Sequence, residues 1–443
     1  MNIDVVSDSI IWFNLSVGLL LLFVAKKRAK TMANPVTFAL VIHFFHNWAF
    51  DFASRFVALE TNTPESPTSM AIFEVRLTNL FGIIALCIPM IWLMGKRPRF
   101  KQKSTPLIAV KPQLLEAIYI ATLPLPFLLG TGSTASGQAL TSLEAFNPIG
   151  VLLLIRSFLV INAISYRIYH KMNAQIWSLV VIFILEGIFM LVFGWRKVFM
   201  IIVCSTMIMM VIRWGVPKLR NVILAIFLGL VLVIVGQFVA DTRQSRQDVS
   251  FGESVKDYVK SVRGDPVQWI GRALVLTSSE GVQYWSCDVW SQSSVDYLLG
   301  RSYLQAAVNT VVPRVFQGDV RDWQAAYAFK YQAYANEVEM GYDFSFSAEA
   351  IINWGPYFSW ISFLILGVLW GQIWRFRYSS IWWFNLNAVF AAVTVVAFRA
   401  DSVAFARFVF VGTVPFYMIS LLFAYSGFSS VSRKESSDVL IDA

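Results

Sequence analysis

The chain has 443 residues, of which 57% are hydrophobic and only 14% are charged, whereas soluble domains carry about 25% charged residues. This composition excludes an ordinary soluble protein. Continuous apolar runs of roughly 20 residues, long enough to cross the hydrocarbon core as helices, also argue against a β-barrel, whose strands are short and alternating. We therefore predict an all-α polytopic integral membrane protein.

The apolar runs predict about 11 transmembrane helices, within a range of roughly 10–14. In chain order they lie at about residues 9–25, 34–58, 71–94, 113–130, 148–168, 175–194, 198–213, 221–240, 351–373, 381–398 and 404–425. The connections between them alternate in character. One set is rich in Lys and Arg, and the other is acidic, neutral or rich in Gly, Ser and Thr.

This alternation predicts the orientation of the chain. Short basic loops stay in the cytoplasm, so the N-terminus is expected outside and the C-terminus inside. The net charge of +9 then lies mainly against anionic lipid on the inner side, and membrane lipids rather than nucleic acid are the expected partners.

A long polar segment interrupts the series of spans and divides the chain into three parts. Residues 1–240 hold transmembrane helices 1–8, residues 241–350 form a large outer loop, and residues 351–443 hold helices 9–11 and a cytoplasmic tail. Within the loop, 268–276 and 297–312 combine helical apolar spacing with Trp and Tyr. They predict amphipathic helices on the outer membrane surface.

Cysteine and histidine are rare, with three residues of each. The cysteines are scattered, which argues against disulfides or a cysteine metal site. His43 and His46 lie three residues apart and share a helix face, but two histidines inside a membrane span are more often hydrogen-bonded packing residues than metal ligands. No P-loop, glycine-rich phosphate loop or Asp-x-Asp motif occurs in the expected cytoplasmic segments. We predict no metal and no cofactor.

Two opposite charges fall inside predicted spans, where each charge costs a few kcal/mol and requires a partner or a function. Arg156 and Glu186 are both expected about 12–14 Å beneath the outer surface, so we predict that they form an intramembrane pair. Such a pair either fixes the packing of the bundle or lines the floor of an outward-open cavity. Both interpretations remain open at this point.

Other cations gather at the expected outer ends of the helices and in the loop. Arginine binds phosphate oxygens through two parallel hydrogen bonds and keeps its charge in a low-dielectric site. As a group these residues predict a diphosphate-binding mouth, although binding to lipid headgroups explains any one of them alone. They are Arg196, Lys197, Arg272, Arg301, Arg314, Arg399 and Arg407.

Two motifs in the loop carry a family resemblance. One is Tyr297-Leu-Leu-Gly-Arg-Ser-Tyr-Leu, followed by Val311-Val-Pro-Arg-Val-Phe. The other is Phe344-Ser-Phe-Ser-Ala-Glu-Ala-Ile-Ile-Asn-Trp-Gly-Pro-Tyr-Phe-Ser-Trp, which leads into the next span. Together with the span count and the Gly194-Trp-Arg turn, they resemble the Wzy-type oligosaccharide repeat-unit (O-antigen) polymerases of bacterial inner membranes. The resemblance covers the whole architecture, but its motifs involve only about 50 residues.

The resemblance implies a GT-C-like architecture and glycosyl transfer on the periplasmic side of the inner membrane. A growing glycan on undecaprenyl diphosphate would be moved onto a new lipid-linked repeat unit. The implied partners are undecaprenyl-diphosphate-linked oligosaccharide, with a chain-length regulator and a flippase as further candidates. The alternatives are an O-antigen ligase, which uses similar substrates, and a lipid-linked oligosaccharide flippase.

Such a reaction requires a base for the acceptor hydroxyl and cations for the leaving diphosphate. The candidate bases are Glu349, Glu280 and Asp401, in that order. Capping of a helix start explains Glu349 equally well, because a helix N-terminus favours an acid. Asn353 of the second motif is counted with the cations as a substrate-binding residue.

Overall fold

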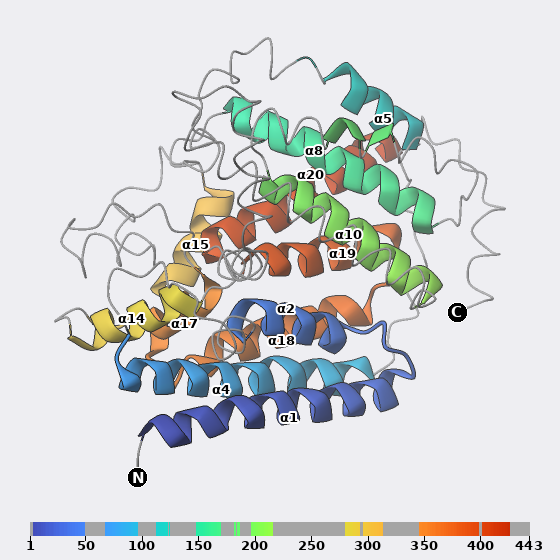
Figure 1. Ribbon diagram of the computed structural model, residues 1–443. Helices are drawn as coiled ribbons and strands as arrows, with labels where there is room; N and C mark the ends of the chain where they lie inside the picture. Colours follow the sequence, from blue (N-terminus) through green and yellow to red (C-terminus); the bar gives the residue numbers. More distant parts are fainter. Residues whose placement is uncertain are drawn as a thin grey trace, which may run out of the picture. The chain divides into compact units, whose positions relative to one another are not determined.

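The computed structural model describes residues 3–48, 67–95, 112–122, 124, 148–169, 181–182, 184–186, 196–215, 280–292, 296–312, 345–397 and 401–425. Every regular element in these ranges is a helix, which confirms the all-α class for the described part of the chain (Figure 1). The chain forms two compact units. The first comprises Met1–Gly95, Pro217–Gly371 and Thr394–Ala406, and the second comprises Lys96–Val216, Gln372–Val393 and Arg407–Ala443.

The helices divide between these units as follows. The first unit contains α1 (Ile3–Ala29), α2 (Pro35–Asn47), α4 (Ser69–Met94), α14 (Glu280–Gln292), α15 (Arg301–Val311) and α17 (Phe346–Trp354). The second contains α5 (Pro112–Ala121), α8 (Pro148–Tyr169) and α10 (Arg196–Trp214). Residues of both units occur in α18 (Trp360–Arg375), α19 (Ile381–Ala397) and α20 (Ser402–Tyr425).

Polar side chains fix where several helices begin. The Asn34 side chain accepts a hydrogen bond from Thr37 N (3.0 Å) ahead of Pro35, the first residue of α2. Thr68 caps α4 by accepting from Ala71 N (3.1 Å). A side-chain oxygen at this position satisfies an N–H group that has no partner within the helix, and proline is suited to the first helical position.

In the first unit α4 is the central element. α1 runs alongside it (Figure 1), and α14 packs against both α4 and α17. The core that α4, α14 and α17 share contains Ala71, Val75, Tyr284, Cys287 and Ile351. This apolar contact places one helix of the predicted outer loop directly against a membrane helix.

Glycines allow α18 to approach α4 closely. A Cβ at Gly367 would collide with the backbone carbonyl of Leu86, and one at Gly82 would lie 3.0 Å from the ring of Phe363. Small residues of this kind let two helix backbones come together in a membrane, where van der Waals packing supports helix association.

The second unit has its own core around α5, α8 and α20, formed by Leu115, Leu159, Ala163 and Phe416. Buried polar groups add directional contacts to it. Asn385 of α19 accepts from the Ser165 hydroxyl (2.7 Å) and donates to Asn162 Oδ1 (2.7 Å). Hydrogen bonds between small polar side chains of neighbouring helices are a common means of holding membrane bundles together.

Three helices of the described part are long and apolar enough to cross a membrane: Val6–Ala29, Ser69–Met94 and Ser402–Ile419. Shorter apolar helices include Phe158–Tyr169, Met200–Trp214 and Ile381–Val395. The predicted span 221–240 lies outside the described residues, and 175–194 lies largely outside them. The total of about 11 helices therefore remains a prediction.

Two predicted spans differ from the observed helices. The prediction of one helix over 351–373 is wrong, because α17 ends at Trp354 and α18 begins only at Trp360. Gly355 separates them with φ +75°, a conformation that glycine adopts readily and that cannot continue a helix. α2 ends at Asn47, within the segment predicted as 34–58, where Trp48 N donates to Phe44 O (3.0 Å).

Candidate functional site

The second loop motif folds into α17. Its start is fixed by Ser345, whose hydroxyl accepts a hydrogen bond from Ala348 N (3.0 Å). Every side chain from Phe346 to Asn353 is buried. Glu349 lies in the first turn and is only 1% exposed. A carboxyl at this depth needs hydrogen-bond donors, because an unpaired buried charge is strongly unfavourable.

The first loop motif docks onto the C-terminal end of α17. Leu298 N donates to Ile352 O (3.1 Å), and Leu299 N donates to Asn353 O (2.9 Å). These contacts satisfy carbonyls that a helix end leaves without intrahelical partners. Gly300 then turns the chain into α15 with φ +84°, and a Cβ there would lie 3.2 Å from the ring of Trp354. Glycine therefore suits this position for two reasons: it adopts a positive φ readily, and it has no Cβ to crowd the Trp354 ring.

The Glu349 carboxyl joins three segments that are distant in sequence. Its Oε1 accepts from the Ser302 hydroxyl (2.5 Å) and from the Ser402 hydroxyl (2.6 Å). Its Oε2 accepts from Ser402 N (2.6 Å) at the start of α20. Charge-assisted bonds of this length are among the stronger hydrogen bonds in proteins.

Asn353 completes the connection between the two motifs. Its Nδ2 donates to Ser302 Oγ (2.7 Å) and to Glu349 O (2.8 Å), and its Oδ1 accepts from Gly300 N (2.9 Å). All three bonds are formed by a fully buried side chain. We call Glu349, Ser302, Ser402 and Asn353 the carboxyl network.

The surroundings of Glu349 set its proton affinity. Burial raises its pKa to about 7, and the negative charge of Asp401 acts in the same direction. Hydrogen bonds from Ser302 and Ser402 oppose these effects, since they stabilise the ionised form. A carboxyl that titrates near neutral pH is suited to act as a general base.

Two further predicted site residues are sequence neighbours of this network. Arg301 is exposed and directly precedes Ser302 as the first residue of α15. Asp401 directly precedes Ser402 and caps α20 by accepting from Ala404 N (3.0 Å). One candidate base and one candidate phosphate-binding residue are therefore sequence neighbours of the two serines that hold Glu349.

The other predicted residues are not brought to the network by the described contacts. Glu280 is the first residue of α14, and Arg196 and Lys197 begin α10, with side chains outside the described part. Arg407 lies on α20 and is partly buried. Arg272, Arg314 and Arg399 lie outside the described residues.

Sequence reasoning missed the two serines. Ser302 lies within the first motif, between Arg301 and Tyr303. Its position in the motif could therefore have indicated that it belongs to the site. Ser402 has no such signal, because only the fold brings the start of α20 to α17. A serine hydroxyl in a helix often bonds to the backbone of its own helix, as Ser286 does with Val282 O (2.7 Å).

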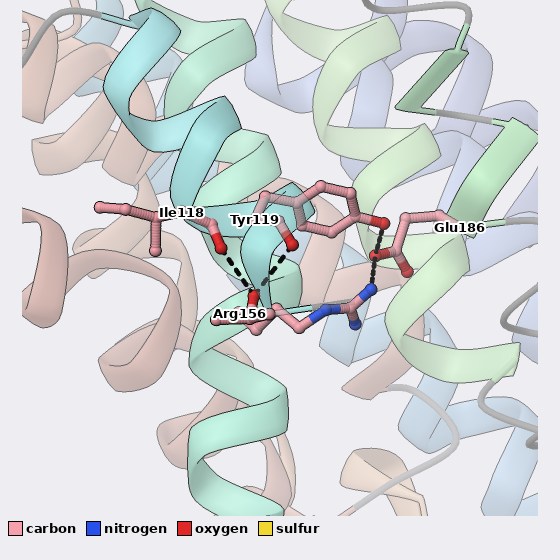
Figure 2. Close-up of polar contacts among 5 residues, drawn as sticks. Ile118, Tyr119, Arg156 and Glu186 are labelled. Atoms are coloured by element: carbon pink, nitrogen blue, oxygen red, sulfur yellow. Dashed lines mark hydrogen bonds and ion pairs between the residues drawn. The ribbon is translucent and has the colours of Figure 1, made fainter. Parts of the chain in front are cut away.

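A second buried charge cluster lies in the other unit (Figure 2). Arg156 Nη2 lies 3.3 Å from Glu186 Oε1, and the Tyr119 hydroxyl donates to the same oxygen. The Arg156 guanidinium also stacks over the Tyr119 ring at 4.5 Å. All three residues are buried. The ion pair and the stacked ring hold α5 and α8 together with residue 186.

A chain of buried amides crosses the first unit. His43 bonds to Asn79 O (3.1 Å) through Nε2 and to Asn47 Nδ2 (2.7 Å) through Nδ1. Gln283 of α14 donates to Asn47 Oδ1 (2.7 Å). Since Asn47 Nδ2 is a donor, His43 Nδ1 accepts and Nε2 carries the proton. Within the described residues, no group of three or more His, Cys, Asp and Glu side chains is arranged to hold a metal.

Comparison with known proteins gives one match. A family model described as O-antigen polysaccharide polymerase Wzy matches residues 137–429, which include both loop motifs and every residue of the carboxyl network. No match was found among curated proteins or among solved structures.

Proposed function

Because the chain belongs to the O-antigen polysaccharide polymerase Wzy family, an integral membrane family, we propose that it extends surface glycans by transferring a growing, undecaprenyl-diphosphate-linked chain onto a new lipid-linked repeat unit. The observation that supports this most directly is the carboxyl network. It joins the two loop motifs to the first turn of α20 at one buried carboxyl.

The proposed reaction forms one glycosidic bond and breaks one glycosyl–phosphate bond. A hydroxyl of the acceptor unit attacks the anomeric carbon of the growing chain, and its proton passes to a carboxylate. The bond from the anomeric carbon to the diphosphate oxygen breaks, and undecaprenyl diphosphate leaves with the electron pair. No nucleotide sugar is consumed.

We assign the base role to Glu349. With a pKa of about 7, Glu349 is still ionised in a substantial fraction at neutral pH and is a stronger base than an ordinary carboxylate, and the N–H group of Ser402 supports the ionised form. In this scheme the Ser402 hydroxyl, the more exposed of the two serine donors, gives up its place on Oε1 to the acceptor hydroxyl. Asp401 and Glu280 are the second-choice bases.

We assign charge neutralisation to the outer arginines. Arg301 is the best supported, because it is exposed and directly precedes Ser302. Cations fixed beside a leaving diphosphate stabilise the charge that develops in the transition state. Arg196, Lys197, Arg272, Arg314, Arg399 and Arg407 are proposed to complete this set, with Asn353 supporting the substrate-binding segment.

The proposed topology follows the charge pattern of the loops. We propose about 11 membrane helices in the bacterial inner membrane, a GT-C-like arrangement, a periplasmic N-terminus and a cytoplasmic C-terminus. The loop at 241–350 is then periplasmic, the side on which we propose that polymerisation takes place. Cysteine-accessibility labelling of residues in 131–147 and at the C-terminus tests this orientation.

The decisive experiment combines purified protein in lipid nanodiscs with lipid-linked repeat units, followed by gel separation of the glycans. A ladder of chain lengths is expected from the wild type. Glu349→Gln and Arg196→Ala are expected to fold normally and to yield only single repeats. Absence of a ladder from folded wild-type protein would overturn the proposal. Transfer to added lipid A core would indicate a ligase, and translocation without new bonds would indicate a flippase.

A further inference from the structure

A second cluster of polar and aromatic side chains lies beyond the C-terminal end of α17. It consists of Glu74 on α4, Tyr297 ahead of α15, and Tyr357 in the turn between α17 and α18. The Tyr357 hydroxyl is hydrogen-bonded to the Glu74 carboxylate, and Tyr297 lies within electrostatic range of both. We call these residues the tyrosine–glutamate cluster.

The two rings are held in place but remain accessible. Tyr297 and Tyr357 are 40% and 47% exposed. One end of the Tyr297 ring lies against Gly355, where an added Cβ would be 3.1 Å from its Cζ atom. Thr78, one helical turn after Glu74 on α4, donates to Pro356 O (2.9 Å) and so anchors the turn that carries Tyr357.

Within the described residues, the Glu74 carboxylate is hydrogen-bonded to the Tyr357 hydroxyl and takes part in no ion pair. The ion pair that α4 forms within the described residues joins Arg76 to Asp8 (3.1 Å) and does not involve Glu74. The neighbouring Asp288 is committed to the start of α4, since it accepts from Thr68 N (3.1 Å) and Thr68 Oγ1 (2.5 Å). Glu74 thus places acceptor oxygens close to two partly exposed tyrosines.

We propose that the tyrosine–glutamate cluster is a glycan-binding subsite for hydroxyl-rich, non-acidic sugars. Tyrosine offers an apolar ring face and a polar hydroxyl on one rigid group, which matches the mixed surface of a pyranose. A carboxylate accepts hydrogen bonds from sugar hydroxyls. The negative charges of Glu74 and Asp288 disfavour phosphate, so the cluster takes the sugars and not the diphosphate.

The position relative to Glu349 supports this assignment, which rests on the proposed polymerase function. Gly355 follows Glu349 by six residues, a distance of about 9 Å along a helix axis. A glycan whose reacting end lies at the carboxyl network therefore reaches the cluster with a nearby sugar. The cluster then binds a sugar of the repeat unit that is not the one forming the new glycosidic bond.

Direct binding tests the subsite. The probe is the delipidated repeat-unit oligosaccharide of the source bacterium, released by mild acid and titrated into protein in nanodiscs by saturation-transfer NMR. Tyr297→Ala and Tyr357→Ala are expected to weaken binding by about tenfold each, as loss of an aromatic contact predicts. Glu74→Gln keeps the side-chain shape and is expected to weaken it by roughly fivefold.

The matched control is Phe358→Ala. Phe358 neighbours Tyr357 and is more exposed, at 60%, and none of the interactions described for Glu74 involves it. It is expected to bind within about twofold of the wild type. Equal losses in Phe358→Ala and Tyr357→Ala would mean that these aromatics only anchor the turn at the membrane surface, and this result would overturn the subsite. Wild-type affinity in Tyr357→Ala and Glu74→Gln would overturn it as well.

Chain extension separates this inference from the proposed function. At low concentrations of lipid-linked units the cluster variants are expected to extend chains more slowly, and saturating concentrations are expected to restore the rate. If wild-type protein binds the oligosaccharide but makes no ladder, the polymerase proposal fails and the subsite stands. If the wild type makes a ladder and the variants match it at every concentration, the subsite fails and the polymerase proposal stands.

Discussion

The Ser302 hydroxyl donates to Glu349 Oε1 at 2.5 Å, although 47 residues separate the two positions. This contact turns two separate loop motifs into one structural unit. Asn353 strengthens it by donating to the same serine (2.7 Å) and accepting from Gly300 N (2.9 Å). A change on either motif is therefore expected to disturb the other.

Glu349→Gln is expected to abolish chain extension while the protein still folds. The amide can direct its oxygen to Ser402 N–H and its NH₂ group to the two serine hydroxyls, which are able to accept. In the wild type the base must be ionised, so extension is expected to rise with pH through about 7. Ladder assays between pH 6 and 8 measure this, and a flat wild-type profile would contradict the base role.

Glu349 also predicts a pH-dependent stability. Its pKa is raised in the folded protein, so folding is favoured when the group is protonated. This contribution is complete below the ordinary value of 4.5 and is lost as the pH rises through about 7. The wild type is expected to lose a few degrees of melting temperature between pH 5 and pH 8 relative to Glu349→Gln. Thermal unfolding in detergent checks this, and parallel curves for the two proteins would argue against it.

Ser302→Ala is expected to lower stability by about 1–2 kcal/mol, because Glu349 Oε1 and Asn353 Nδ2 each lose one of two buried hydrogen-bond partners. Ser286→Ala is the matched control, since the bond described for that buried hydroxyl goes to Val282 O of its own helix (2.7 Å). Denaturant or thermal unfolding compares the two. Chain extension should fall in Ser302→Ala and stay near wild type in Ser286→Ala, and equal effects would remove the special role of Ser302.

Gly300→Ala and Gly215→Ala separate backbone strain from side-chain collision. Both glycines have positive φ, +84° and +82°, which costs roughly 1–2 kcal/mol for an L residue. An added Cβ meets nothing within 4 Å at Gly215 but lies 3.2 Å from the Trp354 ring at Gly300. Gly300→Ala should therefore be the more destabilising and should also impair chain extension. Equal melting temperatures would show that the tryptophan moves aside freely.

The buried pair in the second unit permits a charge-reversal test. Arg156→Glu and Glu186→Arg are each expected to cost about 3–5 kcal/mol, since each leaves like charges buried together. The double reversal should recover part of that stability, and Tyr119→Phe, which removes one hydroxyl, should cost only about 1 kcal/mol. If the double variant folds but does not extend chains, the pair lines a functional cavity. Recovery of both properties would mean that the pair only fixes packing.

Sequence analysis identified Glu349, Asn353 and Arg301, because each stands in a recognisable motif. It also predicted that Arg156 and Glu186 are partners, a prediction that depends on their equal depth in two consecutive spans. It failed at 351–373, where apolar character continues through a break. Hydropathy is insensitive to φ, and Gly355 interrupts the helix with a positive φ without making the segment less apolar.

The sequence by itself determined the helical class, the membrane character and the identity of the two motifs. These depend on local properties: apolar length, residue type and short spacing. Only the tertiary structure decided that Ser402 donates to Glu349 and that Glu74 faces two tyrosines. Those contacts join segments far apart in the chain, and no local pattern encodes which distant segments the fold brings together.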